Sequence, residues 1–328
     1  MPRKKLTFAP LAALAILLAG CQRPPAEPAT YHDTRSFPAA EGKLVRLHVS
    51  SLDPEIVVAA GDHITVEVRL SAQASSGAAA ARWVERHTPQ IDDSPAALEI
   101  RAARRWGTLM VGFLRTTAHL RVVLPPSCRL EITTSSGDVS IDGTETLNAP
   151  VRITTTSGDV SVRGGVRSLE VRTTSGDLQA TGQELEQLQL RSTSGDATVR
   201  APLRAVLADA TSGDLRLEGL RGDLSAHSTS GDVRAAWADL PAGASIRAET
   251  TSGDVRLRLP SLAGVTGELR TRTGTVRTKA PGRWERRDRH LVLIPSPHGA
   301  PPPEEAPGGA KVTVDVSTRS GDISLRST

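Results

Sequence analysis

The chain has 328 residues, only 2% of them aromatic, and its 40 lysines and arginines nearly balance 36 aspartates and glutamates, giving a formal net charge of +4. Single-strand binding needs stacking aromatic side chains and a basic surface, so this composition argues against a nucleic-acid-binding protein. The aliphatic residues are scattered singly rather than in helical clusters, which favours a repetitive β architecture.

The first 20 residues are typical of a secretory signal peptide. Three basic residues, 3–5, precede an apolar stretch, 11–19, that is too short to span a bilayer as a mature helix. The stretch ends in Leu-Ala-Gly-Cys at 18–21, which resembles the lipobox of bacterial lipoproteins. This resemblance implies that the Cys21 thiol accepts diacylglycerol and that Cys21 becomes the lipidated first residue of an exported protein. The alternative is an ordinary signal peptide.

The residues after Cys21 predict how the protein is held at the membrane. Gln22 rather than an aspartate follows, and in Gram-negative bacteria that resemblance favours the outer membrane over the inner one. Whether the protein faces the periplasm or the cell surface is left open. Fatty acyl chains such as palmitate contribute about 0.8 kcal/mol per buried CH2, so they anchor a folded domain without a transmembrane helix. Residues 21–40 contain four prolines and predict an extended, Pro-rich tether.

Residues 41–128 are predicted to form N-terminal strands and an irregular cap. Segments 43–49 and 64–70 alternate between apolar and polar residues and indicate the first coil of the repeat region or its cap. Residues 78–87 predict a short helix, and residues 97–123 predict further strands. Such a cap would protect the open edge of the repeat region from pairing with another chain.

A Ser-Gly-Asp motif recurs through residues 129–328. Successive motif glycines are 18 to 22 residues apart up to Gly274, which lies in a degenerate Thr-Gly-Thr copy. A period of this size is typical of one coil of a solenoid, because each unit is too small to bury its own apolar face. The intact copies place their glycine and aspartate at Gly137 and Asp138, Gly158 and Asp159, Gly176 and Asp177, Gly195 and Asp196, Gly213 and Asp214, Gly231 and Asp232, Gly253 and Asp254, and Gly321 and Asp322.

Aligning the copies on glycine reveals two strands in each coil. Apolar residues stand five and seven positions before almost every glycine, and two and four positions after it, with mostly polar residues between them. Alternation with period two is typical of a strand buried on one face. Each coil is therefore predicted to be strand, corner, strand and return turn. The predicted fold is all-β: a single-stranded parallel β-solenoid with about 18–22 residues per coil and an irregular N-terminal cap.

The corner residues have physical roles. Glycine tolerates a positive φ where the chain bends, and serine and aspartate side chains can accept backbone N–H groups freed by the bend. A threonine or serine three positions before the glycine predicts an inward hydroxyl ladder, which Ala210 breaks. Stacked coils would place the aspartates in a column at about 4.8 Å. We expect these carboxylates to bind the turn backbone and expect no cofactor; a calcium ladder is the alternative.

A Pro- and Gly-rich segment at about 295–310 predicts a disordered insertion. It accounts for the separation of 47 positions from Gly274 to Gly321 and precedes a final coil over 311–325.

The repeated Thr-Thr-Ser-Gly-Asp-Val unit, the strand before it and the lipoprotein leader together resemble the putative-adhesin family of bacterial β-strand-repeat proteins. These are domains of unknown function related to toastrack domains. The resemblance covers roughly residues 41–328. It implies a parallel β-solenoid on the bacterial envelope, without established catalysis.

The sequence predicts neither a catalytic nor a metal site. Polysaccharide-cleaving β-helices need clustered acids or bases, often with aromatic sugar platforms, whereas the acids here recur at corners. HExxH, GxSxG, P-loop and CxxC motifs are absent. Apart from Cys21 the only cysteine is Cys128, which alternates in phase with buried positions and predicts a small buried side chain.

Two classes of function follow. The first is a non-catalytic binding or structural module that contacts an envelope protein or polysaccharide through the polar faces of the solenoid. The second is a periplasmic sensing or regulatory lipoprotein in envelope-stress signalling. A polysaccharide-active β-helix enzyme is a weaker third. The expected partners are the membrane, through the lipid anchor, and an envelope polymer or protein, with no nucleic acid.

Overall fold

The computed structural model describes residues 28–102, 114–262, 264–278, 283–287, 290–294 and 312–327. The predicted signal peptide with Cys21 and the predicted insertion at 295–310 lie outside these residues. None of the helices in the described ranges has the length and apolar character needed to cross a membrane.

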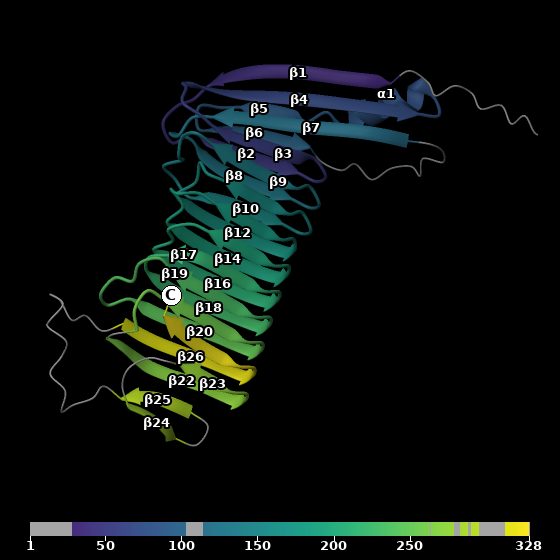
Figure 1. Ribbon diagram of the computed structural model, residues 1–328. Coiled ribbons are helices and arrows are strands. Elements are labelled where there is room, and N and C mark those ends of the chain that lie inside the picture. Colours follow the sequence, from purple (N-terminus) through teal and green to yellow (C-terminus); the bar gives the residue numbers. More distant parts are fainter. Residues whose placement is uncertain are drawn as a thin grey trace, which may run out of the picture.

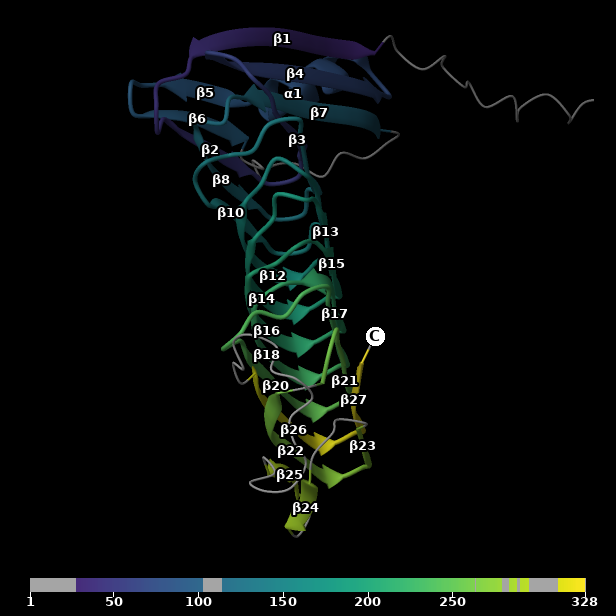
Figure 2. The same cartoon turned by 60° about the vertical axis from the view of Figure 1, so that its left-hand side comes forward.

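The molecule is a rod built from two long sheets that run side by side from a cap to a far end (Figures 1 and 2). Sheet A contains the strands that follow the corners. In order of pairing it comprises β1 (Ala29–Pro38), β4 (His63–Ala74), β7 (Leu114–Leu124), β3 (Asp53–Val58), β9 (Val139–Gly143), β11 (Val160–Arg163), β13 (Leu178–Thr181), β15 (Ala197–Arg200), β17 (Leu215–Leu220), β19 (Val233–Trp237), β21 (Val255–Leu259), β27 (Ile323–Ser327) and β23 (Val276–Thr278).

Sheet B contains the strands that precede the corners. In order of pairing it comprises β24 (Arg283–Arg287), β25 (His290–Ile294), β22 (Val265–Thr273), β26 (Val312–Ser320), β20 (Ser245–Ser252), β18 (Asp223–Ser230), β16 (Ala205–Ser212), β14 (Gln187–Ser194), β12 (Ser168–Ser175), β10 (Val151–Thr155), β8 (Arg129–Thr134), β2 (Leu44–Val49), β6 (Ala97–Ala102) and β5 (Gln90–Asp93).

The coils stack in the register that the glycine alignment predicts. Ile153, five residues before its glycine, pairs with Ile132 on one side and Val171 on the other, each at the same offset. All three side chains are buried between the sheets. Burying an aliphatic side chain of this size contributes about 1.5–3 kcal/mol, which no coil could gain alone. The predicted all-β parallel solenoid is confirmed.

The cap closes one end of the rod with antiparallel strands and a short helix. β4 pairs antiparallel with β1 and β7. The helix, α1 (Gly77–His87), begins after Ser76, whose side chain accepts a hydrogen bond from the Ala79 N–H, and it buries Ala80 and Val84. The segment 43–49 contains β2, which with β3 forms a coil of the stack, whereas 64–70 belongs to the cap strand β4.

The predicted tether is wrong over most of its described part. Residues 29–38 form β1, which pairs with β4 along its whole length. Tyr31 and Phe37 pack against the core, and this apolar contact outweighs the prolines. Pro28 precedes the strand and Pro38 ends it, at the edge of the sheet, where a missing N–H disrupts no internal ladder.

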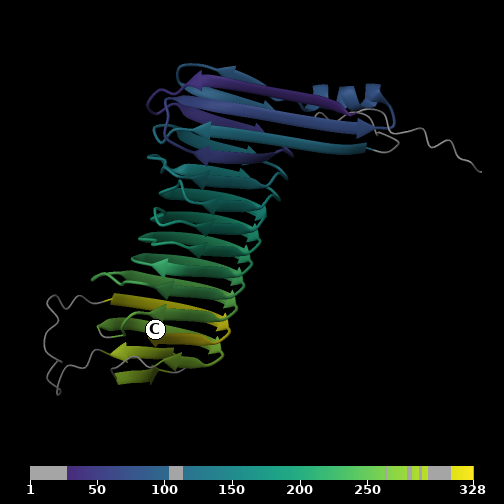
Figure 3. The same ribbon diagram turned by 45° about the horizontal axis from the view of Figure 1, so that its top comes forward.

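The order of the coils differs from their order in the chain at both ends of the rod. The final coil, β26 and β27, lies between the coil of β20 and β21 and the strands β22 and β23. Its yellow strands run between green ones in Figure 3. At the cap, β2 and β3 likewise lie between β6 and β7 on one side and β8 and β9 on the other. The coil that is last in the chain is therefore not last in the stack.

Candidate functional site

Of the two cysteines, the structure describes Cys128 but not Cys21. Cys21 lies outside the described residues, and its lipidation stays a prediction. Cys128 is free and fully buried, as its alternating phase predicts. Burial raises the pKa of the Cys128 thiol, so this side chain behaves as a small apolar residue rather than as a reactive thiolate.

The corner glycines are required by close stacking. A Cβ on Gly158 would lie 2.0 Å from the carbonyl oxygen of Gly137, and one on Gly176 would lie 2.0 Å from that of Gly158. A positive φ, the reason suggested by the sequence, begins only at Gly195, where it is 121°. The first three corners therefore need glycine because another backbone passes directly against them.

The corner aspartates form a ladder along the rod. In each pair of neighbouring coils, the Oδ1 of one aspartate accepts a hydrogen bond from the backbone N–H of the residue at the same position in the next coil. The distances run from 2.8 to 3.0 Å, beginning at Asp53 and ending at Asp322, which accepts from the Thr275 N–H. Within the described residues, these carboxylates are structural acceptors.

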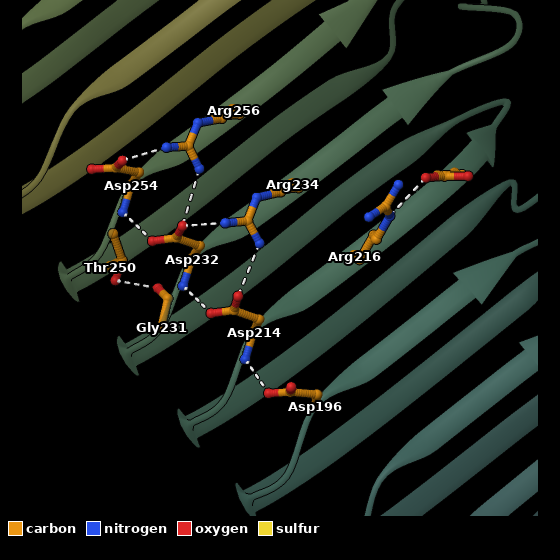
Figure 4. A network of polar contacts seen from close by, with 10 residues as sticks. Asp196, Asp214, Arg216, Gly231, Asp232, Arg234, Thr250, Asp254 and Arg256 are labelled. Atoms are coloured by element: carbon orange, nitrogen blue, oxygen red, sulfur yellow. Dashed lines mark hydrogen bonds and ion pairs between the residues drawn. The ribbon is translucent and has the colours of Figure 1, made fainter.

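Arginines beside the ladder pair with its carboxylate oxygens. Arg234 bridges Asp214 and Asp232, with N···O distances of 2.9 and 2.5 Å, and Arg256 bridges Asp232 and Asp254, at 3.0 and 2.6 Å (Figure 4). Burial, the largest single influence, raises the pKa of Asp214. The Asp232 N–H and the Arg234 guanidinium outweigh it, so the net pKa is lowered and Asp214 stays ionised.

The inward hydroxyl ladder changes its role along the rod. Thr155 and Thr173 accept hydrogen bonds from the N–H of their corner glycines at 2.9 Å. Further along, Thr250 donates instead to the carbonyl oxygen of the neighbouring Gly231. Between them, Ser228 pairs in the sheet with Ala210, the residue that breaks the ladder. The Ser228 hydroxyl is completely buried and has no hydrogen-bond partner among the described residues.

Replacing Ser228 by alanine is expected to stabilise the protein by about 1 kcal/mol, because it removes a buried hydroxyl that has no partner. Urea unfolding followed by circular dichroism would measure the change. The contrasting variant is Thr155→Val, which leaves the Gly158 N–H without its acceptor and should cost about 1–3 kcal/mol. A loss of stability in Ser228→Ala would mean that this hydroxyl does have a partner in solution.

The outer face of sheet A is hollowed near the far end of the rod. The hollow has a volume of about 450 Å³, and we call it the arginine hollow. It lies over β17, β19, β21, β27 and β23. Its lining includes Arg234, Arg256, Arg258, Arg277, Ser324 and Arg326.

The arginines of the hollow differ in whether they pair with a carboxylate. Arg234 and Arg256 are held by the aspartate ladder. Arg258, Arg277 and Arg326 form no ion pair with any described residue. Arg258 and Arg326 are exposed and stand side by side on β21 and β27.

The charge of Arg277 acts on a carboxylate that also lines the hollow. Hydrogen bonds from Thr275 and, more weakly, the charge of Arg277 lower the pKa of Asp322. The hollow therefore combines space with two neighbouring arginines, Arg258 and Arg326, that no described carboxylate pairs.

This hollow was not predicted from the sequence, although the aligned repeats place arginines at the positions that form it. Arg258 and Arg326 both stand five positions after their corner glycines. They become neighbours only because β27 pairs with β21, an order that the chain does not reveal. Across the described parts of the chain, no three histidine, cysteine or acidic side chains are grouped so that they could hold a metal ion.

The chain matches one known protein family. Residues 118–210 and 205–326 match Toastrack DUF4097. No curated protein matches the chain.

Several solved structures are similar at low identity. A putative adhesin from Parabacteroides merdae ATCC 43184 shares 10% identity over 90% of this chain and 96% of its own, with a TM-score of 0.38. A putative adhesin from Bacteroides fragilis NCTC 9343 shares 11%, over 90% and 97%, with a TM-score of 0.36. A putative lipid binding protein from Parabacteroides distasonis ATCC 8503 shares 11%, over 90% and 96%, at 0.36. Similarities this low carry no information on function.

The two matched segments overlap at residues 205–210 and together span most of the rod, including the far end with the arginine hollow. The Ser-Gly-Asp corners lie within them, as do the two-strand coils from β8 onward, up to residue 326. The chain belongs to the toastrack family, Toastrack DUF4097.

Proposed function

We propose that this protein is an exported lipoprotein of the bacterial envelope whose rod serves as a non-catalytic binding or structural module. The observation that carries the proposal is how the repeated polar residues are used. The corner aspartates accept backbone hydrogen bonds from the next coil and pair with arginines. The side chains on which catalysis would draw are thus engaged in holding the coils together, while the outer faces remain large, charged and available for contact.

The geometry of the rod supports a role as a spacer. Ala29, where β1 begins, lies in the cap, eight residues after Cys21. Eight residues span at most about 30 Å. From β3 to β27 the stack rises by eight strand spacings, or about 40 Å. A lipid anchor at Cys21 would therefore leave the cap nearest the membrane and hold the arginine hollow away from it.

The anchor is tested by labelling cells with a palmitate analogue and separating membranes from soluble proteins. The wild-type protein should be labelled and sediment with outer membranes. Cys21→Ala should lose both properties, whereas Cys128→Ala, which changes the buried cysteine, should keep both. Label that persists in Cys21→Ala, or a wild-type protein without label, would remove the anchor from the proposal.

The face of the membrane is tested by protease treatment of intact cells. Cleavage without opening the outer membrane would place the rod at the cell surface and favour an adhesin-like role. Protection until the outer membrane is opened would place it in the periplasm, where a scaffold or sensing role would follow.

A further inference from the structure

We infer that the arginine hollow binds a phosphorylated saccharide, gripping its phosphoryl group between Arg258 and Arg326. The inference deepens the proposed function, on which it rests for a location where such saccharides occur. It names the ligand class for a surface that the proposed function leaves general.

Arg258 and Arg326 are unusual for their position in the repeat. Arg163 and Arg200 also stand five residues after a corner glycine, on the same face of sheet A. The Nε of Arg163 lies 3.7 Å from Oδ1 of Asp142, and the Nε of Arg200 lies 3.0 Å from Oε2 of Glu218. Arg258 instead faces a second arginine across the strand pair. Like charges directly opposite on adjacent strands are unfavourable unless an anion lies between them.

Two small residues make room for such an anion. Ala236 pairs with Glu218 on one side and Arg258 on the other, so the carboxylate that would complete the pattern is missing beside Arg258. Ser324 stands between Arg256 and Arg277, at a position where the three preceding coils of the stack carry Arg216, Arg234 and Arg256. Both small residues line the hollow. Its shape thus follows from two short side chains, one on each side of β21.

The charge of the hollow favours a phosphoryl group over a carboxylate. A phosphate monoester carries about −1.5 to −2 charges at pH 7, which two guanidinium groups can neutralise. A single carboxylate would leave one arginine uncompensated. Guanidinium groups also bind phosphate through two parallel hydrogen bonds, a geometry that adjacent strands can offer from both sides. Arg277 also lines the hollow, where its charge is shared with the carboxylate of Asp322.

The remainder of the hollow suits a hydroxyl-rich group. A volume of about 450 Å³ exceeds what a phosphate ion fills. Asp322 lines it, and hydrogen bonds from Thr275, the largest influence, lower the pKa of this carboxyl group, so it stays ionised and can accept from sugar hydroxyls.

A membrane surface fits the hollow less well. Among the described residues the exposed large hydrophobic side chain is Leu207, on β16 of sheet B, not beside the hollow. The large apolar residues that line the hollow, Leu217, Leu257 and Ile323, are buried between the sheets, so none is free to insert below a lipid headgroup. A saccharide phosphate is therefore the occupant that charge, volume and surroundings favour.

The test is calorimetric titration of the purified full-chain protein with glucose 1-phosphate, glucose 6-phosphate and mannose 6-phosphate at low ionic strength. Glucose, glucuronate and inorganic phosphate are titrated alongside. We expect at least one sugar phosphate to bind more tightly than all three comparison compounds. Arg258→Gln/Arg326→Gln should weaken this binding by about tenfold or more, because charged hydrogen bonds are lost. The matched control, Arg163→Gln/Arg200→Gln, changes two paired arginines at the same repeat position and should leave the affinity unchanged.

Each other outcome overturns the inference in a defined way. Equal affinity for inorganic phosphate would show a phosphate site without saccharide recognition, and tighter binding of glucuronate would show a carboxylate site. Phosphatidylglycerol vesicles are titrated in the same way, and binding to them but to no sugar phosphate would show a membrane contact. No binding of any sugar phosphate, or equal weakening in the control variant, would remove the hollow as a saccharide site. None of these results changes the labelling of Cys21, so failure of the inference and failure of the proposed function are separable.

Discussion

Replacing Gly158 by alanine should destabilise the rod by about 3 kcal/mol or more. The added Cβ would lie 2.0 Å from the carbonyl oxygen of Gly137 and 2.7 Å from its carbonyl carbon. These are backbone atoms of a coil that is hydrogen-bonded on both sides, so relief requires the two coils to separate. Separation would lengthen the bond from the Asp159 N–H to Asp138. Urea unfolding of the variant and the wild-type protein measures the difference.

Two other glycines separate close approach from backbone strain. Gly243 has a φ of 83° but open space around its Cβ position, so Gly243→Ala should cost only about 1–2 kcal/mol, the penalty of the left-handed conformation. Gly61 has open space and no positive φ, so Gly61→Ala should leave the stability unchanged or slightly raised. If Gly158→Ala were no worse than Gly243→Ala, stacking distance would not be the reason for glycine at the corners.

Deleting residues 312–328 is expected to disorder more of the rod than the deleted coil. Among the described strands of its sheet, β23 pairs with β27 alone, and β22 is connected to the rest of the rod through β26. Without β26 and β27, the buried Val265 and Leu269 of β22 lose their neighbours. Hydrogen exchange should therefore show loss of protection in β22, β23, β24 and β25, while β20 and β21 stay protected.

The control for this deletion is a shorter chain that ends at residue 260. It lacks the strands of both outer coils and should unfold at the same urea concentration as the chain ending at 311, since both end in the coil of β20 and β21. A stack ordered as in the chain would behave differently. In that case β22 would keep its protection when residues 312–328 are removed.

The repeating part of the fold was predictable because each coil has the same alternation of apolar and polar residues around its corner glycine. Residues at one offset from the glycine, such as Ile132, Ile153 and Val171, fall in one column and pair with one another. A one-residue slip would turn every buried side chain outward, so alternation fixes the register. The corners followed from the same alignment, although the reason for glycine at Gly137, Gly158 and Gly176 is close approach rather than a positive φ.

The non-repeating features could not be obtained in this way. In β1 only a few apolar residues, among them Tyr31 and Phe37, make contact with the core, and the local composition resembles a tether until β4 is present as a partner. The strands that pair with β26 and β27 are distant in the chain, and the sequence pattern within a coil does not indicate which coil it will pair with. The pairing of Arg258 with Arg326, and with it the arginine hollow, depends on that choice.

The placement of the final coil also sets an order of events in folding. In the middle of the rod, hydrogen bonds join residues 18 to 22 positions apart, so each coil can pair with the one before it in the chain. The bond from the Asp322 N–H to Asp254 instead closes 68 residues. Closing the longer loop costs only about 1 kcal/mol more entropy than closing one of 18 residues. This entropy difference is small. The pairing of β22 and β23 is late because their partner strands, β26 and β27, come after them in the chain. Until then, the growing rod ends in the unpaired edges of β20 and β21.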